Sequence, residues 1–141
     1  MTLHRYSGAC HCGNIQFEFC SARLLGEFRP RSCDCSFCSK HGASYVSDPR
    51  GKLAIAVRDR EALNSYRQGS ASAEFLICAK CGVLTAAVYT EGERRYGTVN
   101  CNAIENSQAL GQAIRVSPRT LGADDKKARW KDLWFADVCL G

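Results

Sequence analysis

Hydrophobic and polar residues alternate most regularly near the amino-terminal end of the chain. In the segment NIQFEF, residues 14–19, each hydrophobic side chain follows a polar one. A period of two is typical of a β-strand that buries one face against a core. The pattern therefore predicts a strand with Ile15, Phe17 and Phe19 on its buried face.

Further short segments rich in branched and aromatic residues predict more strands. They cover residues 44–46, 53–57, 75–78, 84–89, 96–100 and 113–116. Segments with turn-forming residues, such as SDPRG, RQGS and TEGE, separate several of them, as hairpin connections require. We therefore expect a mainly β protein built from short antiparallel sheets.

A few short helices are predicted in addition, at residues 103–110 and 124–137. In the second, Trp130, Trp134 and Val138 share one face behind an acidic start. This pattern predicts an amphipathic helix that packs over a sheet. A helix that binds a partner protein is the alternative.

The chain shows no sign of division into parts. No linker or low-complexity tract interrupts the 141 residues, of which 45% are hydrophobic. We therefore expect a single domain over residues 1–141 with one buried core. No apolar run reaches the ~18 residues that cross a bilayer. The opening segment MTLHRYSGACHCG lacks the apolar core of a signal peptide, so we expect a cytoplasmic protein without a membrane partner.

Cysteine is the most informative residue type, with ten in the chain. In a reducing compartment, metal ligands or reactive thiols are expected rather than disulfides. If seven cysteines bind two zinc ions as thiolates, seven negative and four positive charges lower the formal charge from +5 to +2. A nucleic-acid partner is therefore not expected from the charge.

The first cysteine group consists of two close pairs. Cys10 and Cys12 form a C-x-C pair, and Cys78 and Cys81 form a C-x-x-C pair, with a glycine directly after each. Four thiolates on two tight turns are the ligand set of a structural zinc, and glycine tolerates the positive φ of such turns. Small buried thiols in the core are the alternative.

The second group consists of Cys33, Cys35 and Cys38 in the segment CDCSFCSK. Alternation places the first two on one side of an extended backbone, and the C-x-x-C turn returns the third towards them. Three protein ligands with one open position are typical of a catalytic zinc. A fourth ligand would instead make the site structural, and the candidates for it are Cys20, Cys101 and Cys139.

A zinc ion held by three thiolates favours a particular chemistry. The site carries a net charge of −1, so the metal is a weaker Lewis acid than zinc on three histidines. It suits binding of an incoming thiol, whose pKa the metal lowers. Lys40 and His41 follow the group and are candidates for pairing with a substrate carboxylate and for moving a proton. A solvated lysine and a capping or core histidine are the alternatives.

Two other function classes compete with a thiol-binding enzyme. A zinc-stabilised binding module would fill the second metal's open position with a cysteine. It would also gather a basic surface, for which the candidates are Arg29, Arg31, Lys40, Arg94 and Arg95. A thiol redox sensor would use the CSFC motif, but a redox C-x-x-C normally opens a helix in a βαβ unit, which the pattern does not predict.

The cysteine motifs together resemble a known family. GACHCGNIQFEF, CDCSFCSKHG and FLICAKCGVL are similar in order and spacing to the glutathione-dependent formaldehyde-activating enzymes, a family that includes centromere-protein-V-like domains. The resemblance covers residues 6–100. The chain departs from the family pattern at Asp34, where histidine is usual, and at Ser39, where arginine is usual.

The resemblance implies a fold, two metal sites and an activity. The fold would be a zinc-stabilised β-tent, with a structural zinc on Cys10, Cys12, Cys78 and Cys81 and a catalytic zinc on Cys33, Cys35 and Cys38. The activity would be that of a carbon–sulfur lyase, in which glutathione and formaldehyde are joined to S-hydroxymethylglutathione or the adduct is released. The expected partner is therefore a small thiol such as glutathione.

Overall fold

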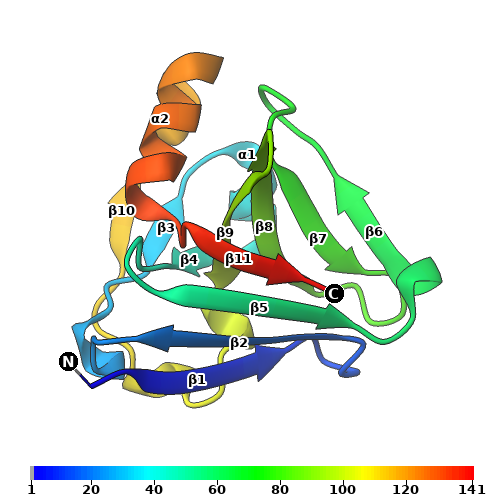
Figure 1. Ribbon diagram of the computed structural model, residues 1–141. Coiled ribbons are helices and arrows are strands. Elements are labelled where there is room, and N and C mark those ends of the chain that lie inside the picture. Colours follow the sequence, from blue (N-terminus) through cyan, green and yellow to red (C-terminus); the bar gives the residue numbers. More distant parts are fainter. Residues whose placement is uncertain (1) are drawn as a thin grey trace.

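The computed structural model describes residues 2–141, and the prediction of a mainly β protein is confirmed. The strands form a four-stranded sheet in the order β1-β2-β5-β11 and a seven-stranded sheet in the order β10-β3-β4-β9-β8-β7-β6. Figure 1 shows the first sheet across the lower half of the molecule, with strands of the second rising behind it.

The four-stranded sheet contains both ends of the described chain. Its strands are β1 (His4–Ala9), β2 (Ile15–Ser21), β5 (Lys52–Val57) and β11 (Asp137–Leu140). β2 pairs antiparallel with β1 and β5, whereas β11 runs parallel to β5. The predicted alternation is confirmed in β2, where Ile15, Phe17 and Phe19 are buried in the core.

The seven-stranded sheet is antiparallel except at one edge. Its strands are β3 (Arg31–Cys33), β4 (Ser44–Val46), β6 (Leu63–Tyr66), β7 (Glu74–Cys78), β8 (Leu84–Glu91), β9 (Arg94–Asn100) and β10 (Ile114–Val116). The short edge strand β10 runs parallel to β3, with Val116 opposite Cys33. This pairing brings the segment after β10 next to the second cysteine group.

Side chains from both sheets form the main core. Phe19 and Leu53 of the four-stranded sheet belong to the same buried cluster as Leu76 and Val99 of the seven-stranded sheet. Phe135 is fully buried in this cluster, with its ring centroid 5.4 Å from that of Phe19. Aromatic burial of this kind contributes strongly to stability.

Two α-helices flank the seven-stranded sheet, α1 (Ser36–His41) and α2 (Ala123–Leu133). α2 packs over the sheet through Trp130, whose ring centroid lies 5.3 Å from that of Tyr89 in β8 and 5.0 Å from that of Trp134, directly after the helix. The predicted amphipathic helix is therefore confirmed. No helix within residues 2–141 has both the length and the apolar character needed to span a membrane.

The predicted end of this helix at residue 137 is wrong. α2 ends at Leu133, and Trp134 already has an extended backbone. The backbone groups of Phe135 exchange hydrogen bonds with those of Gly97 in β9, at 2.9 and 3.0 Å. Sheet pairing therefore replaces helical hydrogen bonds, and Val138 lies in β11 rather than on the helix face.

The predicted helix at residues 103–110 is also wrong. The chain forms two short 3₁₀ turns there, at Cys101–Ala103 and Ser107–Ala109. Asn106 lies between them in the left-handed conformation, with φ of 63°, which interrupts a right-handed helix. The remaining 3₁₀ turns are at Leu25–Glu27, Arg60–Ala62 and Pro118–Thr120.

Candidate metal centres and the adjoining pocket

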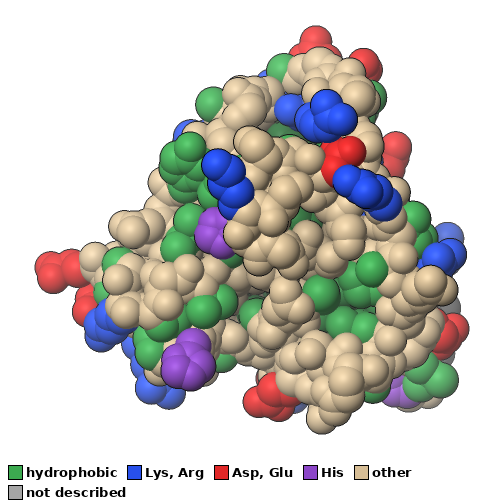
Figure 2. All heavy atoms as spheres, turned by 180° about the vertical axis from the view of Figure 1, so that it is seen from behind, with side chains coloured by type: hydrophobic (Ala, Val, Ile, Leu, Met, Phe, Trp, Pro, Cys, Tyr) green, Lys and Arg blue, Asp and Glu red, His purple; other side chains and the backbone are tan. Residues whose placement is uncertain are grey.

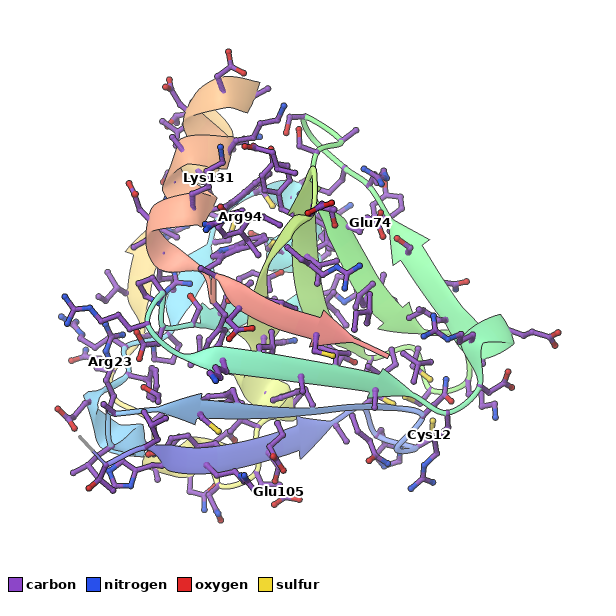
Figure 3. The ribbon with its side chains drawn as sticks, viewed as in Figure 1. Cys12, Arg23, Glu74, Arg94, Glu105 and Lys131 are labelled. Atoms are coloured by element: carbon purple, nitrogen blue, oxygen red, sulfur yellow. The ribbon has the colours of Figure 1, made fainter. Side chains whose placement is uncertain are left out.

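The first cysteine group comes together at the ends of two hairpins. Cys10 and Cys12 lie in the loop between β1 and β2, where Figure 3 shows Cys12. Cys78 ends β7, and Cys81 lies in the loop before β8. All four sulfurs lie within 4.8 Å of one another. A metal ion held by them would cross-link the two sheets.

Sulfur separations in this group suit a tetrahedral metal. Sγ of Cys12 lies 3.8 Å from Sγ of Cys10 and 3.5 Å from Sγ of Cys78. Zn–S bonds of about 2.3 Å in a tetrahedron place two sulfurs about 3.8 Å apart. The donor set and its spacing therefore fit zinc.

The loops favour the thiolate at Cys81 but not at Cys12, where a backbone N–H of Asn14 acts to lower the pKa and the neighbouring thiols raise it to about 11. The backbone N–H of Ile15 donates to Sγ of Cys10 at 3.2 Å. Burial acts to raise the pKa of Cys81, but backbone N–H groups and neighbouring thiols outweigh it and lower that pKa to about 6. Gly13 and Gly82 have φ of 83° and 78°, which confirms that each cysteine pair is followed by a glycine in a conformation that other residues rarely adopt.

The second cysteine group lies where β3 passes into α1. Cys33 ends the strand, Cys35 is the N-cap of the helix, and Cys38 lies in the first helical turn. Sγ of Cys35 accepts a hydrogen bond from the backbone N–H of Cys38 at 3.4 Å. The three sulfurs lie within 4.8 Å of one another, so they could hold one metal ion.

The helix at this group was not predicted. The CSFC motif does open a helix, although the sequence pattern predicts none there. The flanking strands β3 and β4 pair antiparallel, however. The parallel βαβ unit of redox C-x-x-C proteins is therefore not formed around this helix.

No further cysteine of residues 2–141 joins the three-cysteine group. Cys20 and Cys139 lie in the four-stranded sheet, and Cys101 begins a 3₁₀ turn after β9. None of them belongs to the cluster of sulfurs that could share a metal with Cys33, Cys35 and Cys38. The group therefore offers three protein ligands.

A tyrosine contacts the buried sulfur of this group. The hydroxyl of Tyr45 in β4 lies 3.1 Å from Sγ of Cys38. Burial raises the pKa of Tyr45 far above its ordinary value, so the phenol stays protonated and can donate to a thiolate. A hydrogen bond with Cys38 lowers the pKa of Cys33 to about 6, although burial opposes the change.

All three cysteines of the group line a pocket of about 390 Å³. One wall is formed by Trp130 of α2 and by Trp134 directly after that helix, and another by the loop around Gln68. This arrangement places the sulfurs near aromatic side chains in a pocket of a size that binds small molecules.

Four cationic side chains also line the pocket, namely Arg31, Arg119, Lys126 and Arg129. Arg119 pairs with Asp34 at 3.2 Å, and the Ser117 hydroxyl donates to the same carboxylate at 2.6 Å. The bond from Ser117, aided by Arg119, lowers the pKa of Asp34. Through these two contacts, Asp34 holds the segment after β10 next to the three cysteines.

Arg31 is held within the pocket wall. Its guanidinium donates to the Ser47 hydroxyl at 2.6 Å, and Ser47 donates to the carbonyl of Leu133 at 2.7 Å. Burial, with added repulsion from Arg129 and Arg23, lowers the pKa of Arg31 to about 10. The side chain is therefore positively charged at neutral pH.

The two predicted substrate contacts, Lys40 and His41, lie outside this pocket. Lys40 and His41 are exposed on α1, and neither lines the pocket. The His41 ring packs against Phe37, with ring centroids 4.7 Å apart. The cations that do reach the pocket include Arg119, Lys126 and Arg129, which the sequence analysis did not single out because only tertiary contacts bring them near the cysteines.

A solved structure has a similar fold, but it gives no information on activity. No family model matches the chain. The structure is similar to the crystal structure of a Rhodobacter sphaeroides protein determined by structural genomics, with a TM-score of 0.50 and 27% sequence identity. The match covers 77% of this chain and 99% of that protein.

Proposed function

We propose that this protein is a zinc-dependent enzyme of the carbon–sulfur lyase type. Its substrates would be a small thiol, such as glutathione, and formaldehyde or a related carbonyl compound, or the adduct of the two. The observation that carries the proposal is the three-cysteine group in the wall of a pocket of about 390 Å³, with three sulfurs within 4.8 Å of one another. Two zinc ions per chain are proposed, one for each cysteine group.

Zinc at Cys33, Cys35 and Cys38 would offer a thiol a coordination position and lower its pKa. The residues of the chain would hold the ligand and shelter it. Tyr45 would stabilise negative charge on the sulfur of Cys38 through the 3.1 Å contact. Trp130 and Trp134 would exclude water from one side of the pocket.

The proposed reaction balances without an external oxidant or reductant. The sulfur electron pair forms a bond to the carbonyl carbon while the carbonyl π bond breaks. The carbonyl oxygen takes up the proton that the thiol has lost, which gives a hydroxyalkyl thioether. The reverse steps release the thiol and the carbonyl compound.

A non-catalytic zinc-stabilised binding module remains the competing function. That hypothesis predicts a fourth cysteine at the second group, drawn from Cys20, Cys101 and Cys139. The group of sulfurs described above contains none of them. The enzyme is therefore the better supported proposal.

Cobalt substitution tests the proposed thiol site directly. Protein loaded with Co²⁺ is titrated with glutathione and with 2-mercaptoethanol while the sulfur-to-cobalt charge-transfer absorption is followed. We expect the absorption to increase with added thiol in the wild type and in Cys139→Ser, whose exposed side chain lies outside both groups. We expect Cys38→Ser to lose the response. An unchanged wild-type spectrum with both thiols would contradict the proposal.

The activity is measured separately. Formation of the hydroxymethyl thioether from formaldehyde and glutathione is followed by proton NMR exchange spectroscopy with zinc-loaded protein. We expect faster exchange with the wild type than with Cys38→Ser. Equal exchange rates would mean that the protein does not catalyse this reaction, even if it binds a thiol. That result would overturn the enzyme assignment.

A further inference from the structure

Three of the four cations of the pocket have no acidic partner. Arg119 pairs with Asp34. Within residues 2–141, no carboxylate lies within ion-pair distance of Arg31, Lys126 or Arg129, although all three line the pocket. Charged side chains that are partly buried normally acquire a partner.

The two arginines line the same pocket, Arg31 from β3 and Arg129 from α2. Among the described residues 2–141, the Ser47 hydroxyl, at 2.6 Å, is the only side-chain partner of Arg31. A guanidinium has five N–H donors, so most of the donor capacity of Arg31 is available to a ligand.

The negative charge of the zinc-loaded cysteine group would neutralise only part of the positive charge of these cations. Three thiolates with one Zn²⁺ carry a net charge of −1, whereas Arg31, Lys126 and Arg129 carry three positive charges. The pocket therefore has an excess of positive charge before substrate binds. Figure 2 shows several Lys and Arg side chains in the upper part of the face that it draws, together with Asp and Glu side chains.

We propose that Arg31 and Arg129 form a carboxylate-binding subsite in this pocket, with Lys126 as an additional cation. Arginine suits this task because its planar guanidinium can bind both oxygens of a carboxylate. Lys126 and Arg129 come from α2, outside the segment that resembles the formaldehyde-activating family. The subsite deepens the proposed function, since it assigns an anionic substrate to the same pocket.

The carboxylate could belong to either reactant. A mercaptocarboxylate would place its sulfur at the cysteine group and its carboxylate at the arginines. A 2-oxo acid would place its carbonyl carbon near the sulfur and its carboxylate at the arginines. Both share the chemistry of a carboxylate on a small reacting molecule, and the test separates them.

Tryptophan fluorescence gives a local readout of binding. The chain has two tryptophans, Trp130 and Trp134, and both line the pocket. Zinc-loaded protein is titrated with 3-mercaptopropionate and glyoxylate as charged probes. The neutral counterparts are 2-mercaptoethanol and formaldehyde.

Arg129→Gln is the main variant, because Arg129 makes no side-chain hydrogen bond or ion pair in residues 2–141 that its loss would break. We expect this variant to bind at least one charged probe about tenfold more weakly, the size expected for one charge-assisted hydrogen bond. Its affinity for the neutral probes should stay unchanged. Arg129→Lys should recover part of the loss by restoring the charge.

Two control variants remove a positive charge outside the pocket. Lys127→Gln alters the neighbouring lysine of α2, which faces a different depression beside Glu91. Arg94→Gln alters an exposed arginine of β9, labelled in Figure 3. Both should bind the charged probes like the wild type. Near-ultraviolet circular dichroism verifies that each variant keeps its aromatic packing.

The probes separate the sources of the carboxylate. A loss confined to 3-mercaptopropionate assigns the carboxylate to the thiol, and a loss confined to glyoxylate assigns it to the carbonyl compound. Wild-type affinity of Arg129→Gln for both charged probes overturns the subsite, as does an equal loss in the control variants. The cobalt titration with neutral 2-mercaptoethanol tests the proposed function independently, so the two failures are distinguishable.

Discussion

The hydroxyl of Tyr45 lies 3.1 Å from Sγ of Cys38, on the buried side of the three-cysteine group. Tyr45 comes from β4 and Cys38 from the first turn of α1. A hydrogen bond from a neutral phenol withdraws electron density from a thiolate and so weakens it as a donor. The contact therefore adjusts how strongly this group would bind a metal ion.

Replacing Tyr45 by phenylalanine tests that relationship. In Tyr45→Phe, Sγ of Cys38 loses its donor, so we expect the sulfur-to-cobalt absorption to move to lower energy. The free energy of unfolding should fall by about 1 kcal/mol, the usual net contribution of such a bond. Absorption spectra of the cobalt protein and denaturant unfolding measure the two effects. Tyr66→Phe, at a position that is 50% exposed, should change neither.

Loss of a sulfur from the first group should remove one metal ion and weaken the junction between the sheets. We expect Cys12→Ser to contain about one zinc ion per chain where the wild type contains about two, and to unfold at a lower temperature. Metal analysis and thermal unfolding give the two quantities. Cys139→Ser serves as the control, since its side chain is exposed and outside both groups. Equal zinc content in Cys12→Ser and the control would contradict a metal site at the first group.

Asp34 should control the order of the pocket wall after β10. Asp34→Ala removes the acceptor of Ser117 and the partner of Arg119, so we expect faster hydrogen exchange in residues 117–120 with the zinc content unchanged. Mass spectrometry of exchanged peptides measures this change. Asp137→Ala, which removes an exposed pair with Lys52 at 4.0 Å, should leave that segment as in the wild type. Unchanged exchange in Asp34→Ala would show that other contacts hold the wall.

Gly8 should be required for the packing of β1 against the segment after β9. A Cβ at this position would overlap the carbonyl oxygen of Ala103 and the ring of Phe17. We expect Gly8→Ala to lower the free energy of unfolding by about 2 kcal/mol, because backbone must move to make room. Gly122→Ala is the matched control, since Gly122 has φ of −72° and no neighbouring atom within 4 Å of the added carbon. Equal stability of the two variants would contradict this account.

Local patterns predicted the strands that carry strong alternation or clear turn boundaries. β2, β4, β5, β7, β8, β9 and β10 all lie within one or two residues of their predicted positions. The edge strands β1 and β6 and the short strands β3 and β11 were not predicted, because their sequences lack a continuous apolar pattern. β11 exists only because it pairs with β5, far away in the sequence.

The sequence by itself determined which cysteines share a turn, since a C-x-C or C-x-x-C spacing confines two sulfurs to one turn. Only the tertiary structure decided what surrounds them. The pairing of β10 with β3 places Arg119 beside Asp34 in the pocket wall, and the packing of Trp130 and Trp134 places Arg129 in the same pocket. Spacing along the chain governs contacts within a turn, whereas contacts between distant segments depend on sheet pairing and core packing that no local pattern records.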